Sequence, residues 1–174
     1  MRQMQTIRVD ICGGARDGKS ALIARLSSGA PTDRNQFVVA ESANDEHYTR
    51  NLAAGAPIAD VSVVVVDARN GVTAATRRHG FFAALLAVRN IVLAVNKMDL
   101  VADAQAAFGR IDDEFRRLAA QLGLPAVTCV PLSAENGDNV RVRSATMDVF
   151  DEAPIPVPVL PPRSSSVDMS VTVQ

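Results

Sequence analysis

Five short apolar runs, separated by segments with helical spacing, constrain the fold more than any other feature of this 174-residue sequence. Each run is rich in β-branched residues, and none alternates cleanly between apolar and polar residues. This pattern is typical of strands that are buried on both faces of a parallel sheet. The runs are TIRVDICG (6–13), QFVVAE (36–41), VSVVVVDA (61–68), NIVLAVN (90–96) and AVTCVPL (126–132).

Helical patterns fill the intervals between these runs. They span Lys19–Ser27, roughly Asp45–Ala54, Thr73–Val88 and Ala104–Leu122. The last of them places one apolar stripe along a helix, formed by Phe108, Ile111, Phe115, Leu118 and Leu122. Alternating strands and helices predict a doubly wound α/β fold.

The composition predicts one folded domain over residues 1–150 and an extended or disordered tail over residues 151–174. Five of the nine prolines lie between Pro154 and Pro162, a density that neither a helix nor a central strand tolerates. A net charge of −1 favours neither a nucleic-acid partner nor a membrane partner. Cys12 and Cys129 lie in apolar runs, which indicates reduced core thiols. The N-terminal sequence has no apolar signal core, so we expect a cytoplasmic protein.

The segment GGARDGKS follows the first apolar run and precedes a helical pattern. It matches the Gly-x4-Gly-Lys-Ser/Thr pattern of a phosphate-binding loop, whose backbone N–H groups wrap around phosphate oxygens. Lys19 is expected to reach the β- and γ-phosphates, and the Ser20 hydroxyl to bind Mg²⁺. The alternative is an ordinary Gly-rich turn with an exposed lysine. The predicted nucleotide contacts from this loop are Gly13, Asp17, Gly18, Lys19 and Ser20.

Two further motifs follow later strands. NKMD, from Asn96 to Asp99, ends the fourth apolar run, and its carboxylate can accept the two N–H groups on one edge of guanine. LSAENGDN places Ser133 and Ala134 after the fifth run, where a backbone N–H can reach guanine O6. Alone, this segment would be a plain turn. Asn96, Lys97, Asp99, Ser133 and Ala134 are therefore the predicted base-binding residues.

The lysines support this interpretation. The chain has only two lysines against sixteen arginines, and both lysines lie inside the first two motifs. An accidental match would not concentrate them there.

These passages resemble the translation-factor class of P-loop GTPases, and in particular the GTP-binding large subunit of bacterial sulfate adenylyltransferase. The similarity is carried by GGARDGKSALIARL, EHYTRNLAAGA, VVVVDARNGV, TRRHGFF, NIVLAVNKMDLV and LSAENGDNV. The resemblance implies a three-layer P-loop NTPase-like fold. Because the antiparallel strand of the family has no counterpart in this sequence, we expect a mainly parallel sheet of five strands in the order 2-1-3-4-5. It also implies binding of GTP or GDP with Mg²⁺, and pairing with a catalytic small subunit that makes adenosine 5′-phosphosulfate.

The sequence departs from this family at its γ-phosphate sensor. The family pattern Asp-Thr-Pro-Gly-His-Glu is replaced by ESANDE, residues 41–46. Glu41 stands at the position that supports Mg²⁺, and Asp45 stands at the position that orients the attacking water, where a carboxylate repels the γ-phosphate. The segment SSGAPTDRN is too short for the family's Mg²⁺-closing loop, and a proline-rich stretch stands where the family has a last helix and β-barrels. We therefore expect impaired hydrolysis and no confident catalytic residue.

The sequence is also compatible with two alternatives. One is a catalytically silent nucleotide-binding or docking module, and the other is a decayed paralogue with little function. Other polar residues have plain explanations. His47 is expected on a helix surface, and His79 on a helix face or in a partner contact. Arg116 and Arg117 are expected on a solvated helix face. The carboxylates are expected as solvated loop charges; they are Glu41, Asp45, Glu46 and Asp67.

Overall fold

The computed structural model describes residues 5–27, 35–41, 59–124, 127–148, 150 and 154–155, with the backbone alone at 5–7 and 35–41. Five strands form one sheet in the order β2-β1-β3-β4-β5, and every neighbouring pair is parallel. The strands are β1 (Gln5–Gly13), β2 (Asn35–Glu41), β3 (Val61–Asp67), β4 (Asn90–Asn96) and β5 (Val127–Pro131). The expected α/β fold and strand order are confirmed.

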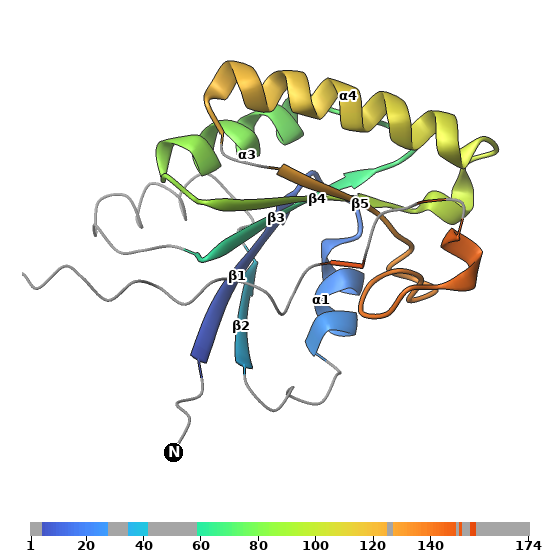
Figure 1. Ribbon diagram of the computed structural model, residues 1–174, viewed down its shortest axis with the longest axis horizontal. Coiled ribbons are helices and arrows are strands. Elements are labelled where there is room, and N and C mark those ends of the chain that lie inside the picture. Colours follow the sequence, from blue (N-terminus) through green and yellow to red (C-terminus); the bar gives the residue numbers. More distant parts are fainter. Residues whose placement is uncertain are drawn as a thin grey trace, which may run out of the picture.

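Helices cover both faces of the sheet (Figure 1). Helix α1 (Lys19–Ser27) lies on one face, while α3 (Ala74–Leu85) and α4 (Ala104–Leu122) lie together on the other. Two short 3-10 turns follow β4 and β5, namely η1 (Met98–Leu100) and η2 (Ala145–Met147). The sheet therefore forms the middle of three layers.

Each face of the sheet has its own apolar cluster, because successive side chains of a strand point to opposite sides. Val64 and Val66 of β3 pack with Phe115 of α4 in one cluster, and Val63 and Val65 pack on the side of α1 in the other. Burial on both sides explains why the apolar runs do not alternate with polar residues. The α4 stripe expected from the sequence is confirmed, with Phe108, Ile111, Phe115 and Leu118 buried and Leu122 partly buried against them.

The ends of α3 and α4 follow from local chemistry. Thr73 caps α3 by accepting a hydrogen bond from the Thr76 N–H, and the Thr76 hydroxyl accepts one from the Thr73 N–H. Asp103 caps α4 through the Ala106 N–H, and Gly123, with a left-handed φ of 65°, ends it. Helix α3 ends three residues before the expected Val88, because the Val88 N–H bonds back to Ala83 O in a terminating turn.

The other expectations from the sequence have mixed outcomes, and some fall on residues that the structure does not describe. His79 lies on a helix, α3, as expected, and it is one of the buried residues of that helix, with 7% of it exposed. Arg116 and Arg117 are exposed, as expected. The helix expected near Asp45–Ala54, together with His47, lies outside the described residues. Most of the predicted tail does too, although Ile155 is buried in the cluster on the α1 side.

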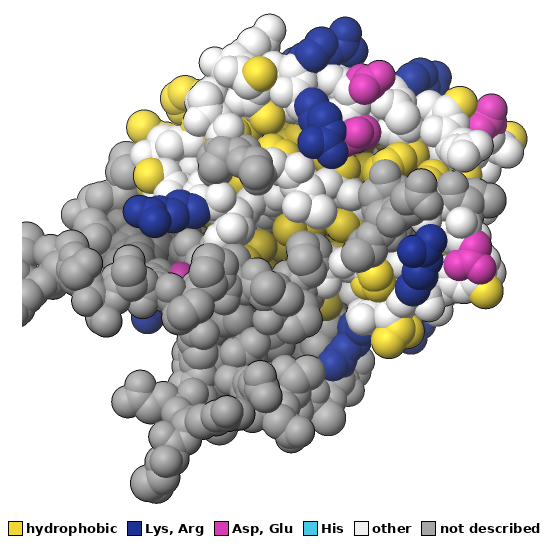
Figure 2. All heavy atoms as spheres, viewed as in Figure 1, with side chains coloured by type: hydrophobic (Ala, Val, Ile, Leu, Met, Phe, Trp, Pro, Cys, Tyr) yellow, Lys and Arg dark blue, Asp and Glu magenta, His cyan; other side chains and the backbone are white. Residues whose placement is uncertain are grey.

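The outer surface carries charges of both signs. On the face seen in Figure 2, Lys and Arg side chains of the described residues are interspersed with Asp and Glu side chains. None of the helices in the described ranges is both long enough and apolar enough to cross a membrane.

Candidate functional site

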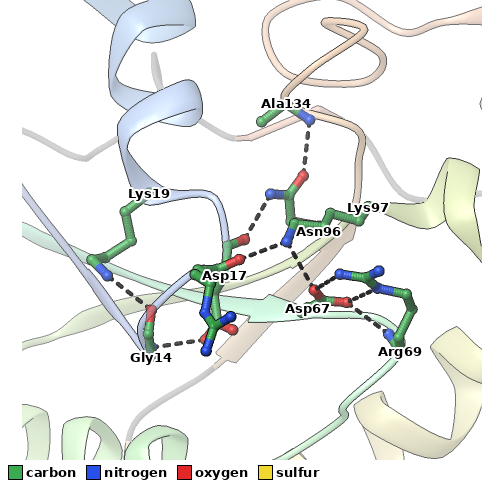
Figure 3. Close-up of polar contacts among 9 residues, drawn as sticks. Gly14, Asp17, Lys19, Asp67, Arg69, Asn96, Lys97 and Ala134 are labelled. Atoms are coloured by element: carbon green, nitrogen blue, oxygen red, sulfur yellow. Dashed lines mark hydrogen bonds and ion pairs between the residues drawn. The ribbon is translucent and has the colours of Figure 1, made fainter.

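The candidate site lies along the carboxyl ends of β1, β3, β4 and β5, where the parallel strands place their following loops together. The phosphate loop leaves β1 at Gly13 and enters α1 at Lys19. The Lys19 ammonium donates to the backbone oxygens of Gly13 and Gly14, at 3.2 and 2.9 Å. The loop therefore holds its own cation against its backbone (Figure 3).

Asp17 contributes a buried carboxylate to the same loop. Asp17 is 5% exposed, and its Oδ2 accepts a hydrogen bond of 2.7 Å from the Gly14 N–H. Burial raises the pKa of the Asp17 carboxyl above its ordinary value, the nearby Asp67 charge adds to this, and the Gly14 N–H and the Lys19 charge oppose it. The loop therefore carries one ammonium, from Lys19, and one buried carboxylate, from Asp17.

Asn96, the last residue of β4, joins the phosphate loop to the loop after β5. Its Nδ2 donates to Asp17 O at 2.8 Å, and its Oδ1 accepts from the Ala134 N–H at 2.9 Å. Asn96 is 2% exposed, so both bonds are shielded from water. Gly18 lies against this amide so closely that a Cβ there would come within 2.1 Å of Asn96 Nδ2. The glycine of the motif is thus required by packing as well as by its positive φ of 98°.

The two hydrogen bonds of Asn96 form a junction between the phosphate loop and the loop after β5. Lys97 extends this junction to β3. Its ammonium donates to Arg16 O in the phosphate loop and forms an ion pair of 2.9 Å with Asp67 Oδ2. Arg69 holds the same carboxylate through its Nε and Nη2 atoms, at 3.0 and 2.6 Å. These hydrogen bonds, led by those of Arg69, keep the pKa of Asp67 well below its usual range, although burial acts in the opposite direction. Asp67 therefore serves as a fixed negative charge between two cations.

The base-binding candidates after β4 and β5 differ in accessibility. Asp99 lies in η1 and is exposed, whereas Ser133 and Ala134 are buried. The Ser133 hydroxyl accepts from the Asn136 N–H at 3.3 Å, which folds the loop back on itself. The Ala134 N–H, expected to face guanine O6, points to Asn96 in this structure. We call the turn from Ser133 to Asp138, which follows β5, the base loop. The junction holds this loop in place, while the Asp99 side chain stays exposed to solvent.

The donor set suits Mg²⁺ held jointly with phosphate oxygens. Ser20 is exposed in the first turn of α1, next to the phosphate loop, and presents a hydroxyl oxygen. Glu41 ends β2 and pairs with Ile11 of β1, so its backbone reaches the same edge of the sheet. Among the described residues, no group of three His, Cys, Asp or Glu side chains could hold a metal alone. Mg²⁺ usually needs only one or two protein oxygens when a nucleotide supplies the rest.

The structure brings nearly all of the sequence-predicted residues to one edge of the sheet. Direct hydrogen bonds connect Asp17, Asn96 and Ala134, and Lys97 reaches the backbone of the same phosphate loop. Asp45 and Glu46 of the predicted sensor lie outside the described residues, as does the Glu41 side chain.

Sequence reasoning missed two residues. Asp67 was expected as a solvated loop charge, and this is wrong: it is 2% exposed and paired with Arg69 and Lys97. Its position at the carboxyl end of a β-branched run, on the same edge as the phosphate loop, was a signal that could have identified it. Arg25 of α1 was also overlooked, although it reaches Ala134 O at 3.2 Å, because no motif marks it.

Curated relatives match most of this chain but only part of their own length. A bifunctional enzyme NodQ from Rhizobium sp. (strain N33) is 48% identical over 68% of this chain and 18% of the relative. A bifunctional enzyme CysN/CysC from Xylella fastidiosa is 51% identical over 67% of this chain and 19% of the relative. Sulfate adenylyltransferase subunit 1 from Methylorubrum populi is 46% identical over 71% of this chain and 26% of the relative. The chain thus spans about a quarter or less of these relatives.

Among solved structures, sup35 complexed with GDP aligns with a TM-score of 0.66 at 22% sequence identity, covering 87% of this chain and 43% of that one. This similarity shows the fold. The model of the elongation factor Tu GTP binding domain matches residues 32–156, well over half of the chain. The match begins after α1, so the phosphate loop is an independent observation that agrees with it. The chain therefore belongs to the family of the elongation factor Tu GTP-binding domain.

Proposed function

We propose that this chain binds GTP and GDP at the carboxyl edge of its sheet. The observation that carries the proposal is the Asn96 side chain, which joins the phosphate loop at Asp17 to the base loop at Ala134. This one amide holds the two halves of a nucleotide site, formed by residues far apart in sequence, in a fixed relation. Family membership supports the same ligand.

Selectivity for guanine is assigned to Asp99. Its exposed carboxylate is able to accept hydrogen bonds from the N1–H and the exocyclic amine of guanine, and adenine offers no such pair of donors. An unpaired carboxylate facing the wrong base loses its hydration without compensation, which is the main source of discrimination at polar sites. The phosphates are assigned to the loop of residues 13–20, with Mg²⁺ held by Ser20 and Glu41.

The test is calorimetric titration of the purified chain with GDP, ADP and XDP. We expect GDP to bind at least about 100-fold more tightly than ADP, because a site built to hydrogen-bond a substrate strongly rejects an analogue that lacks the group. Asp99→Asn is expected to shift preference towards XDP, whose 2-oxo group requires a donor. Asp113→Asn, on an exposed position of α4, serves as the matched control. Equal affinities for GDP and ADP in the wild type would refute the proposal.

We also propose that GTP hydrolysis is impaired. Phosphoryl transfer requires an oriented water and stabilised charge, and charge stabilisation by one arginine is by itself worth about 10³–10⁵ in rate in known switches. Here Asn44 and Asp45 occupy the positions of the family's glycine and histidine. Single-turnover phosphate release with excess protein and Mg²⁺ is expected to be near background in the wild type and in Asp45→Ala. A family-like rate that collapses in Asp45→Ala would show that the segment is a working sensor.

The physiological role is proposed from the relatives. Similarity to sulfate adenylyltransferase subunit 1 supports a role in sulfate activation. We propose that this role is cytoplasmic and that the partner is a catalytic small subunit. The alternative is a catalytically silent nucleotide-binding or docking module, favoured by the substitutions at Asn44 and Asp45. Size-exclusion chromatography with such a small subunit, with and without GTP, separates the two. Nucleotide-dependent association supports the first role, and nucleotide-independent association the second.

A further inference from the structure

Arg25 connects α1 directly to the base loop. Its Nε donates to Ala134 O at 3.2 Å, and its Nη2 donates to Glu135 O. The partners lie 109 and 110 residues away in the sequence. Figure 1 shows α1 beside the loops that follow β5. The same helix begins at Lys19 of the phosphate loop, so one rigid element touches both halves of the site.

The base loop packs closely against the Arg25 guanidinium at Gly137. Gly137 has a positive φ of 85°, and a Cβ there would lie 3.4 Å from the nearest Arg25 nitrogen. Within the loop, the Gly137 N–H bonds to Ser133 O at 2.8 Å, and the Ser133 N–H bonds to Asp138 O at 3.1 Å. The loop is therefore a closed turn that rests on the planar group of Arg25.

Two contacts hold the backbone of Ala134 on both sides. Its N–H donates to Asn96 Oδ1, and its C=O accepts from Arg25. Asn96 connects the residue to the phosphate loop through Asp17, and Arg25 connects it to the helix that follows this loop. Removing either contact leaves Ala134 fixed from one side only.

We propose that Arg25 is a positioning residue for guanine selectivity, acting by holding the Ala134–Gly137 turn at the base side of the nucleotide site. This inference rests on the proposed function. Hydrogen-bond discrimination between bases depends on donors and acceptors placed within a few tenths of an ångström, so a loop free to shift discriminates poorly. An arginine suits the task because its planar fork satisfies two neighbouring carbonyls at once, which a lysine ammonium does not reproduce in the same geometry.

The first experiment separates the base from the phosphates. Arg25→Ala is titrated with GDP, ADP and inorganic tripolyphosphate, which carries no base. We expect GDP affinity to fall about tenfold, or ~1.4 kcal/mol, while the affinities for ADP and tripolyphosphate stay within about twofold. Arg25→Lys is expected to recover only part of the selectivity. If GDP and tripolyphosphate affinities fall together, Arg25 acts through α1 and the phosphate loop, and the proposal is wrong.

The second experiment needs no nucleotide. Hydrogen–deuterium exchange of the nucleotide-free chain reports the opening of individual amides. Arg25→Ala is expected to speed exchange at residues 134–137 and to leave residues 14–20 unchanged. Arg117→Ala is the matched control, because Arg117 is exposed and bonds to Asp113 O within its own helix. Unchanged exchange at 134–137 in Arg25→Ala would overturn the inference even if the wild type binds GDP. Failure of the wild type to bind GDP would overturn the proposed function and, with it, the role of Arg25 in guanine selectivity, whatever the exchange at 134–137 shows.

Discussion

The phosphate loop and the base-binding edge are held together in different ways. The side-chain bonds within the phosphate loop join residues at most six positions apart, from Lys19 to Gly13 and Gly14 and from Gly14 to Asp17. The base edge depends on bonds between segments 38 to 109 residues apart, centred on Asn96 and Ala134. One half of the site is a local motif, and the other half exists only after the sheet has formed.

The two halves also differ in how the surroundings shift the pKa of a buried carboxylate. In the phosphate loop, burial raises the pKa of Asp17, and one backbone N–H only partly compensates. At the base edge, Arg69 and Lys97 lower the pKa of Asp67 despite its burial. Charge at Asp17 is therefore tolerated, whereas charge at Asp67 is stabilised. We therefore expect replacement of each carboxylate by a neutral amide to change the free energy of unfolding in opposite directions.

The largest effect is expected where the two halves meet. Asn96→Ala removes both bonds of the junction and leaves Asp17 O and the Ala134 N–H buried without a partner. We expect the free energy of unfolding to fall by about 2–6 kcal/mol, since each of the two unsatisfied groups costs about 1–3 kcal/mol. Denaturant titration measures this loss, with Asn70→Ala, at an exposed position, as the control. A loss below about 0.5 kcal/mol, as at ordinary surface sites, would mean that the halves are held together elsewhere.

The next largest effect is expected from a change at Lys19, which should weaken phosphate binding and leave base binding unchanged. Lys19→Ala removes the ammonium assigned to the phosphates, so GTP affinity is expected to fall by more than about 1.5 kcal/mol, the lower end for hydrogen bonds to charged groups. The affinity for guanosine, which carries no phosphate, is expected to stay unchanged. Calorimetry with both ligands tests the separation of the two halves. Unchanged GTP affinity would show that the loop does not hold phosphate.

A smaller effect is expected from Asp67→Asn. Because the pKa of Asp67 is lowered on folding, its stabilising contribution is present above the ordinary aspartate pKa of 3.8 and is lost as the pH falls through the folded value. We expect the variant to be about 1 kcal/mol less stable at pH 7, since Arg69 is half exposed and solvent screens part of the pair. The difference between wild type and variant is expected to shrink below pH 3.8. Unfolding curves at pH 7 and pH 3 provide the check, and a constant difference would contradict it.

The smallest effect, with the opposite sign, is expected at Asp17. Asp17→Asn removes a buried charge and keeps an oxygen that accepts from the Gly14 N–H. Since burial raises the pKa of Asp17, the charged form weakens the fold at neutral pH, and the variant is expected to be equally stable or up to about 0.5 kcal/mol more stable. Thermal unfolding at pH 7 measures it. A clear destabilisation would mean that the loop depends on this charge.

Much of the fold could be predicted because its signals are local. The β-branched runs predicted all five strands to within about one residue at each end, and the spacing of Phe108 to Leu122 predicted α4. The end of α3 was missed, because the turn at Ala87, with its positive φ of 50°, leaves no glycine or proline signal. The roles assigned to Asp99, Ser20 and Glu41 stay predictions.

By itself, the sequence determined the parallel sheet, the position of the phosphate loop and the three segments that meet at its edge. Short-range rules suffice for these, since periodicity and glycine spacing act within one or two turns of chain. The tertiary structure alone decided that Asp67 is buried between Lys97 and Arg69 and that Arg25 supports Ala134. These partners are brought together by strand order and helix packing. No pattern along the chain records which side chains will share a carboxylate or a carbonyl once the layers close.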